Sequence, residues 1–283
     1  MWTIQKPTIT ASSTFDTCIE GISDAGQKTR LEGIRPQIAA AEIEFDARGV
    51  AQEIYLTAGT NTIAGAAGDV TASEMEQLYT RHMARQKSRG HSVYDKIMAS
   101  AVHGQCPFCG HHTVSTLDHT LPKKRHPILA VTPINLIPCC KDCNHNKGTS
   151  APADAVSQFL NAYYDDITAD RWLYAEIVNG SPPGATYFVH PPNNWDQVTV
   201  RRVQNHFDKL KLSRLYASQA GRQLQNIRRS LSSMYDAVGA QAVQQDLETR
   251  SLSCSEFSIN SWEGALYEAA AQSGWYCNGG FRA

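Results

Sequence analysis

The sequence predicts a mainly α protein in which helical N- and C-terminal regions flank a small, cysteine-stapled module of two strands and a helix. Three observations lead to this prediction. Apolar residues recur at helical spacing toward both ends of the chain, two Cys-x-x-Cys pairs lie near its middle, and a short alternating segment follows the first pair. We therefore divide the chain into a helical region at 1–100, the module at 101–150 and a helix-rich region at 151–283.

The N-terminal region carries three helix signals. Residues 26–45 have apolar side chains at helical spacing, and residues 71–87 open with a capping box formed by Thr71 and Glu74. A third helix is expected from Ser92, which has Asp95 three residues further on, and it runs directly into the first cysteine pair.

The two Cys-x-x-Cys pairs have the spacing of metal ligands. Cys106 and Cys109 form the first pair, and Cys140 and Cys143 form the second. Four thiolates make a closed tetrahedral site, which predicts a structural zinc that holds the fold without taking part in chemistry. Cys139 is an alternative to Cys140, but it would turn the second pair into Cys-x3-Cys, which mirrors the first pair less well.

The chain between the two pairs is longer than a simple zinc ribbon requires, and it carries polar residues of a particular kind. Residues 112–121 alternate in the manner of a short strand pair with Asp118 and His119 at its end. Asn135 precedes the second pair and Asn144 follows it directly. If one ion holds both pairs, the fold brings Asp118, His119 and Asn144 to the same place.

The C-terminal region again reads as helical. We expect a helix over 151–167, a strand over 185–192 between Pro/Gly-rich turns, and helical periodicity over 195–238. A last helix is predicted over 261–276, with Ser261 as its N-cap.

Composition limits the class of protein. The chain has 283 residues, 42% of them hydrophobic and 19% charged, and no apolar stretch approaches the length of a membrane span. The first residues lack the apolar core of a secretory signal, so we expect a cytoplasmic protein with no membrane partner. Eight cysteines in such a protein indicate metal ligands rather than disulfides.

Positive charge is concentrated in two blocks, although the net charge is only −1. Residues 81–150 contain ten Lys and Arg against three Asp, and residues 201–230 contain eight against one. Such blocks are typical of a protein that faces a polyanion, and solvated helix faces are the alternative explanation.

Residues 106–148 resemble the HNH endonuclease family, the ββα-metal nucleases, in the form that has a four-cysteine zinc site. The resemblance is carried by "LDH", by "NLIPCC" with its Asn, and by "CKDCNHNKG" after the second strand. It implies that His119 is the general base and that Asp118 and Asn144 bind a catalytic Mg²⁺ or Mn²⁺, with His145 as the weaker candidate for the last ligand. Asn135 would orient the loop that carries His119.

The resemblance also implies hydrolysis of DNA, double-stranded in the first instance, to give 5′-phosphate and 3′-hydroxyl ends. Four cations around the motif are then expected to bind phosphates without reading bases: Lys123, Lys124, Arg125 and Lys147.

Shorter motifs resemble the HNH proteins of anti-phage operons such as the Septu system and its retron-associated relatives. They include "NAYYDDITADRW" and the ending "NSWEGALYEAAAQSGWYCNGGF". This similarity implies a role as a defence nuclease with an ABC-type ATPase partner. Two alternatives without cleavage remain at this stage: a zinc-ribbon module that only binds nucleic acid, and a scaffold that docks the ATPase.

Overall fold

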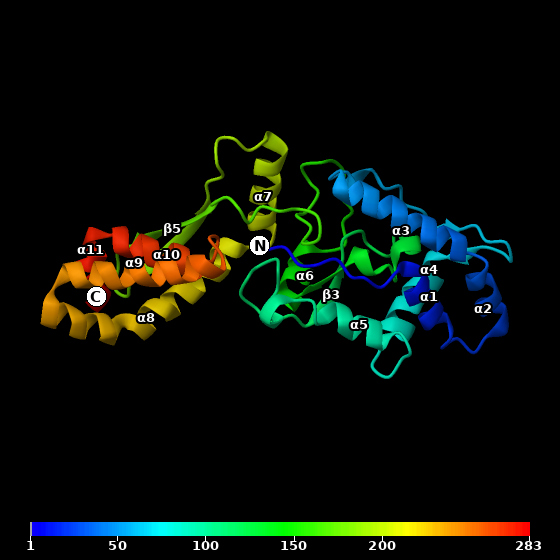
Figure 1. Cartoon of the computed structure of the whole chain (residues 1–283), viewed down its shortest axis with the longest axis horizontal. Coiled ribbons are helices and arrows are strands. Elements are labelled where there is room, and N and C mark those ends of the chain that lie inside the picture. The colour runs from blue at the N-terminus through cyan, green and yellow to red at the C-terminus, as the bar shows by residue number, and fades with distance from the viewer. Residues whose placement is uncertain (1) are drawn as a thin grey trace. The chain divides into compact units, whose positions relative to one another are not determined.

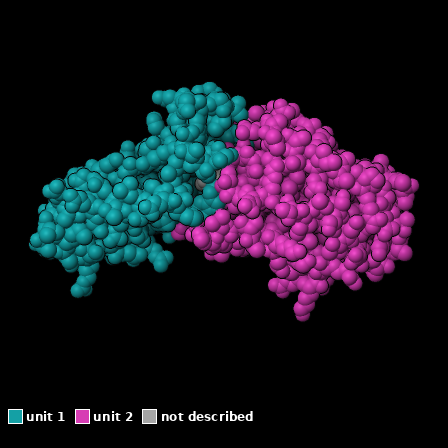
Figure 2. Space-filling view, in the orientation of Figure 1, with its two compact units in different colours: residues 1–2, 166–283 teal, residues 3–165 magenta. Residues whose placement is uncertain are grey.

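The computed structural model describes residues 2–283, and it confirms that the chain is mainly helical. The chain forms two compact units, one of residues 3–165 and one of residues 166–283 together with Trp2 (Figure 2). The sequence-based division at residues 100 and 150 differs from this, because residues 3–100 and 101–150 lie in the same unit. Within the part of the chain that is described, no helix has the length and apolar character needed to cross a membrane.

The first unit contains six α-helices, four short strands and five irregular helical turns (Figure 1). Its α-helices are α1 (Ala11–Ile19), α2 (Ala25–Glu32), α3 (Arg35–Val50), α4 (Ala72–Gln77), α5 (His91–Met98) and α6 (Lys141–Lys147). Its strands are β1 (Thr62–Ile63), β2 (Val70–Thr71), β3 (Thr116–His119) and β4 (Leu136–Cys139). Its 3-10 turns are η1 (Ile54–Leu56), η3 (Val102–Gly104), η4 (Pro127–Leu129) and η5 (Pro133–Asn135), and η2 (Leu78–Met83) is a π-helical turn that continues α4.

One hydrophobic cluster of the first unit joins the N-terminal helices to β3 and β4. Phe15 and Ile19 of α1 belong to the same buried cluster as Leu117 of β3 and Leu136 of β4. Burial of an apolar side chain contributes roughly 1.5–3 kcal/mol. The small strand pair is therefore stabilised by the N-terminal helices as well as by its own hydrogen bonds.

Strand β3 pairs antiparallel with β4, and α6 follows β4 directly, which gives a strand–strand–helix arrangement. Asp118 lies opposite Ile137, and His119 lies opposite Leu136. The prediction that residues 112–121 contain both strands of the pair was therefore wrong. β3 pairs instead with β4, which follows a long loop, and Thr113 forms an isolated bridge to Gln105.

The helix signals of the N-terminal region have mixed outcomes. The capping box is confirmed, because the Thr71 hydroxyl accepts from the Glu74 N–H and the Glu74 carboxylate accepts from the Thr71 N–H. The helix expected over 26–45 is interrupted at Gly33 and Ile34, where α2 ends and α3 begins. Pro36 follows at the start of α3, where its missing N–H costs nothing.

The helix expected over 151–167 was wrong, because these residues form turns. Side-chain hydrogen bonds replace helical ones here. The Asp165 carboxylate accepts from the Asn161 N–H at 2.7 Å, and the Asn161 side-chain oxygen accepts from the Tyr163 N–H at 2.9 Å. Asn and Asp side chains that bind nearby backbone N–H groups stabilise turns at the expense of helix.

The second unit consists of a β-hairpin and a group of helices. The hairpin pairs β5 (Leu173–Val178) with β6 (Gly184–Val189). The helical elements of the second unit are α7 (Gln197–Lys209), α8 (Leu212–Val238), α9 (Ala240–Phe257), α10 (Trp262–Gln272), α11 (Gly274–Cys277) and the 3-10 turn η6 (Gly280–Arg282). The predicted N-cap is confirmed, because the Ser261 hydroxyl accepts from the Gly264 N–H.

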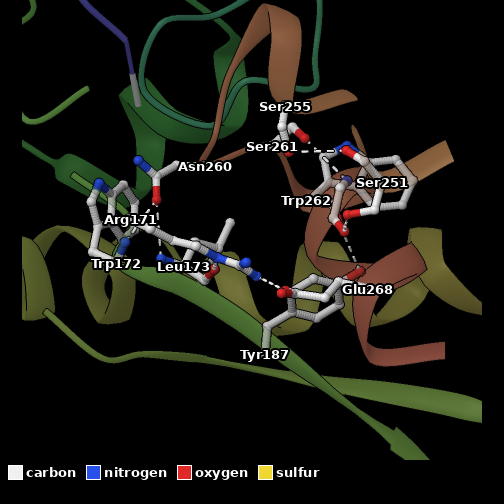
Figure 3. A network of polar contacts seen from close by, with 11 residues as sticks. Arg171, Trp172, Leu173, Tyr187, Ser251, Ser255, Asn260, Ser261, Trp262 and Glu268 are labelled. Carbon is white, nitrogen blue, oxygen red and sulfur yellow. Dashed lines mark hydrogen bonds and ion pairs between the residues drawn. The ribbon is translucent and has the colours of Figure 1, made fainter. Parts of the chain in front are cut away.

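Asn260 ties the start of α10 to the start of β5, and Figure 3 shows this contact network. Its side-chain oxygen accepts from the N–H groups of Trp172 and Leu173 at 2.8 and 3.1 Å, and its side-chain nitrogen donates to the Asp170 carbonyl. Arg171 forms an ion pair with Glu268 of α10 beside it. Asn260, Trp172 and Leu173 are all buried, so these backbone groups depend on the Asn260 side chain for their hydrogen bonds.

We expect Asn260→Ala to lower the free energy of unfolding of the second unit by about 2–3 kcal/mol, because two buried backbone N–H groups lose their acceptor. Asn278→Ala is the matched control, since Asn278 is exposed and its side chain donates to the Gly274 carbonyl within its own turn. Urea unfolding of both variants measures the difference. Equal midpoints would show that the Asn260 contacts contribute nothing specific.

Candidate functional site

The four cysteines predicted to bind zinc lie together. The Sγ atoms of Cys106, Cys109, Cys140 and Cys143 are all within 4.8 Å of one another, and every one of these residues is buried. The Cys109 and Cys140 Sγ atoms are 4.0 Å apart. A tetrahedral zinc with Zn–S bonds of about 2.3 Å places its sulfurs about 3.8 Å apart, so the cluster has the donor set and the size of a structural zinc site.

The local backbone explains how each pair presents two thiols to one point. Gly110 has φ +61°, a left-handed conformation that closes the turn after Cys109, and its N–H donates to the Cys106 carbonyl at 2.8 Å. Cys140 is the N-cap of α6, and its Sγ accepts from the Cys143 N–H at 3.3 Å. Cys139 is the last residue of β4 and lies outside the cluster. The structure therefore confirms Cys140, and not Cys139, as the partner of Cys143 in the four-thiol cluster.

A cavity of about 270 Å³ opens beside the strand–strand–helix arrangement. Asp118 and His119 at the end of β3 line it, and so does Asn144 of α6. The structure therefore brings together the three residues that the sequence placed at one site. His145 is exposed and does not line this cavity, which favours Asn144 over His145 as a cation ligand.

Asp118 is a buried carboxylate with a buried cationic partner. Lys147 Nζ lies 2.9 Å from Asp118 Oδ2, and both side chains are only 5% exposed. The same ammonium donates to the His119 carbonyl oxygen at 2.8 Å. Burial raises the pKa of the Asp118 carboxyl above its ordinary value, and the Lys147 charge offsets part of that increase. Lys147 is thus an interior residue rather than an exposed phosphate contact.

The imidazole of His119 is fixed in one tautomer by its neighbours. Nε2 lies 2.9 Å from the Ala130 carbonyl oxygen, and because a carbonyl can only accept, Nε2 carries the proton. Burial lowers the pKa of His119 to about 3, which keeps the ring neutral. Nδ1 then retains a lone pair. The Tyr79 ring meets the imidazole edge-on, with a centroid distance of 4.5 Å, and limits its rotation.

Asn135 is fully buried and holds the long loop between β3 and β4. Its side-chain oxygen accepts from the Leu121 N–H at 2.8 Å, and its side-chain nitrogen donates to the carbonyls of Leu121 and Leu129. Its own carbonyl accepts from the Thr120 N–H. These hydrogen bonds all join Asn135 to backbone groups, and they fix the segment that leaves His119.

The donor set of the cavity suits a hard divalent cation. Asn144 Nδ2 donates to Thr116 Oγ1 at 3.3 Å, which leaves the amide oxygen available as a ligand. That oxygen and the Asp118 carboxylate are the ligand types that Mg²⁺ and Mn²⁺ prefer. The residues at this cavity therefore fit such an ion.

The predicted phosphate contacts divide into two groups. Lys123 and Lys124 line the cavity. Lys123 Nζ lies 3.9 Å from Glu76 and 5.4 Å from the centre of the Tyr79 ring. Arg125 is exposed but does not line the cavity, and its side chain passes over Gly59.

Two residues at the cavity come from outside the module predicted over 101–150, and the sequence analysis missed both: Glu76 of α4 and Tyr79 of the π-helical turn. Both lie about forty residues before β3 in a segment that reads as an ordinary helix. A π-turn is often found at functional sites, but no residue type in the sequence marks one.

No protein-family profile matches the chain, and no solved structure matches it. A curated relative is the protein named Protein ea31 of Escherichia phage lambda, which is 27% identical over 284 residues. The alignment covers 94% of this chain and 96% of the phage protein. The chain is thus similar to a phage protein along nearly its whole length.

Proposed function

We propose that the protein is a metal-dependent endonuclease of the HNH type that hydrolyses DNA phosphodiester bonds. The observation that supports this most directly is the meeting of Asp118, His119 and Asn144 in one cavity beside the four-thiol cluster. A carboxylate, a neutral imidazole and an amide oxygen are the groups needed to bind a cation and to remove a proton from water.

His119 is the general base of the proposed reaction. Its Nδ1 lone pair accepts a proton from a water molecule while the water oxygen attacks the phosphorus atom. The bond from phosphorus to the 3′ oxygen breaks, the 3′ oxygen takes up a proton from solvent, and the products are a 5′-phosphate and a 3′-hydroxyl. The Ala130 carbonyl and Tyr79 hold the ring in the orientation that presents Nδ1.

Asp118 and Asn144 would hold a Mg²⁺ or Mn²⁺ ion, which supplies Lewis-acid stabilisation of the charge that develops on the phosphate. Lys123 and Lys124 attract the DNA backbone to the cavity, since they are the cations that line it. A zinc held by Cys106, Cys109, Cys140 and Cys143 would have four thiolate ligands and would join the two ends of the segment that carries His119.

The alternative function, a zinc-ribbon module that binds nucleic acid without cleaving it, would explain the thiol cluster but not the polar cavity. A module that only binds nucleic acid does not need a buried carboxylate and an oriented imidazole beside each other. The relative is encoded by a phage, so the proposal does not extend to the anti-phage role or the ATPase partner that the resemblance implies.

Nicking of supercoiled plasmid DNA tests the proposal. We expect the wild type to nick in Mg²⁺ or Mn²⁺, and His119→Ala to be at least about 100-fold slower, because general-base catalysis contributes that much or more. His145→Ala is the matched control, an exposed histidine outside the cavity, and its rate should equal the wild-type rate.

Zinc content and circular dichroism establish that both variants are folded. Cleavage by His119→Ala at the wild-type rate would refute the assigned base. Absence of cleavage by the folded, zinc-loaded wild type on plasmid DNA with either ion would refute the nuclease itself.

A further inference from the structure

Helix α8 of the second unit presents one face to its own core and another to solvent. It has 27 residues, which corresponds to about 40 Å. The buried side chains recur at helical spacing and are Leu212, Tyr216, Ala220, Leu224, Ile227 and Leu231. They pack within the unit, where α8 contacts β6, α7, α9 and α10. The opposite face is left without a protein partner in this unit.

The solvent face of α8 carries three arginines in register. Arg214, Arg222 and Arg229 are all exposed and follow one another at intervals of eight and seven residues. At 100° per residue these positions fall within about 80° of one another around the helix axis. We call them, together with the exposed uncharged residues between them, the α8 arginine face. The other members are Ser218, Gln225 and Asn226.

The charges of this face are not neutralised inside the protein. Within residues 166–283 of the second unit, no carboxylate lies at ion-pairing distance from Arg214, Arg222 or Arg229, whereas Arg171 and Arg250 of the same unit each have one. The only acidic residue of α8 is Asp236 in its last turn, which is paired with Arg282.

The structure also shows which cations of the basic block at 201–230 do not belong to this face. Arg202 is buried, and the Arg228 guanidinium donates to the Arg282 carbonyl at 2.6 Å. The remaining cations of the block are all exposed, and they are the ordered row on α8 and, before it, Arg201, Lys209 and Lys211.

We propose that the α8 arginine face binds the sugar–phosphate backbone of duplex DNA. The row from Arg214 to Arg229 is about 22 Å long, with cations spaced by about 10–12 Å, which suits a long and regular polyanion. Duplex DNA carries one negative charge per about 1.7 Å of axis. The Ser, Gln and Asn side chains between the arginines are further hydrogen-bond donors to phosphate oxygens, and none of them selects a base sequence.

The chemistry of the face argues against an anionic membrane as the occupant. A helix that lies in a membrane surface exposes large apolar residues next to its cations. The apolar stripe of α8 packs in the core of its own unit, and the exposed side chains of the arginine face are all polar, with the half-buried Leu215 beside them. The proposal goes beyond the proposed cleavage, because backbone binding by the second unit does not require that the first unit cuts.

Fluorescence anisotropy with a labelled 30-base-pair duplex, using the full chain without Mg²⁺ or Mn²⁺, measures this binding separately from cleavage. The test variant is Arg214→Gln/Arg222→Gln/Arg229→Gln. We expect its affinity to fall at least about tenfold, and the slope of log affinity against log salt to decrease by about 2.7, because three phosphate contacts are lost. Gln preserves helix propensity, and the corresponding triple Lys variant, which keeps the charge, should bind within a few-fold of wild type.

The matched control is Gln241→Glu/Gln244→Glu/Gln245→Glu on the exposed side of α9, which changes the net charge by the same amount. Its affinity should stay within a few-fold of wild type. The proposal is overturned if the triple Gln variant binds like the wild type, or if the α9 control loses as much affinity. It is also overturned if the triple Gln variant loses binding to phosphatidylserine vesicles while its affinity for the duplex is unchanged.

Discussion

Cys140→Ala is expected to abolish zinc binding and to unfold the unit of residues 3–165, whereas Cys139→Ala leaves the zinc in place. The two cysteines are adjacent in sequence and both are buried, but only Cys140 belongs to the four-thiol cluster. Binding of a structural zinc contributes about 10–16 kcal/mol, which is as large as the whole stability of a typical domain. Three thiolates cannot retain most of that energy.

The comparison is made by metal analysis of the purified proteins and by urea unfolding. Cys139→Ala removes one buried sulfur from β4, and we expect it to cost about 1–2 kcal/mol with one zinc still bound. The reverse result, with zinc lost from Cys139→Ala and kept by Cys140→Ala, would show that the second pair has the Cys-x3-Cys spacing.

Lys147→Met is expected to lower the free energy of unfolding by about 3–5 kcal/mol, because it leaves the Asp118 carboxylate buried without its partner. Met has a similar length and keeps the contact with the surrounding apolar atoms. Lys124→Met is the control, since Lys124 is exposed and makes no ion pair within residues 2–283. A surface change of that kind is worth about 0.5 kcal/mol or less.

A double variant separates the ion pair from general packing. Lys147→Met combined with Asp118→Asn removes both charges, so most of the lost stability should return. Urea unfolding of the zinc-loaded proteins without added Mg²⁺ or Mn²⁺ gives the four values needed. If Lys147→Met is as stable as Lys124→Met, the buried pair does not hold the end of β3.

The sequence was most informative where function or metal binding demands particular residue types at fixed spacing. Two matched Cys-x-x-Cys pairs identify the four thiols of the cluster, and the Thr71 capping box and the Ser261 N-cap locate the starts of two helices. In each case the signal is local, because the interacting atoms are only three residues apart.

The features that escaped prediction depend on contacts between distant parts of the chain. β4 is a strand because it pairs with β3 across a long loop, and the alternation within 112–121 cannot reveal that partner. Tyr79 lies at the cavity because its ring in the turn η2 packs against the imidazole of His119 in β3, which no pattern in 71–87 encodes. Lysine side chains are almost never fully buried, so nothing in the sequence predicts Lys147 in the interior, and its burial follows from the fold.

Because the strands beside the cavity share their hydrophobic cluster with the N-terminal helices, the cavity cannot be moved into another protein without those helices. Leu117 and Leu136 beside the cavity residues belong to the same apolar cluster as Phe15 and Ile19. A fragment of residues 101–150 alone would therefore expose these leucines to solvent. The Ile4 N–H also donates to the Ala162 carbonyl, and this hydrogen bond joins the two ends of the first unit. Evolution or engineering would have to move some 160 residues as one block.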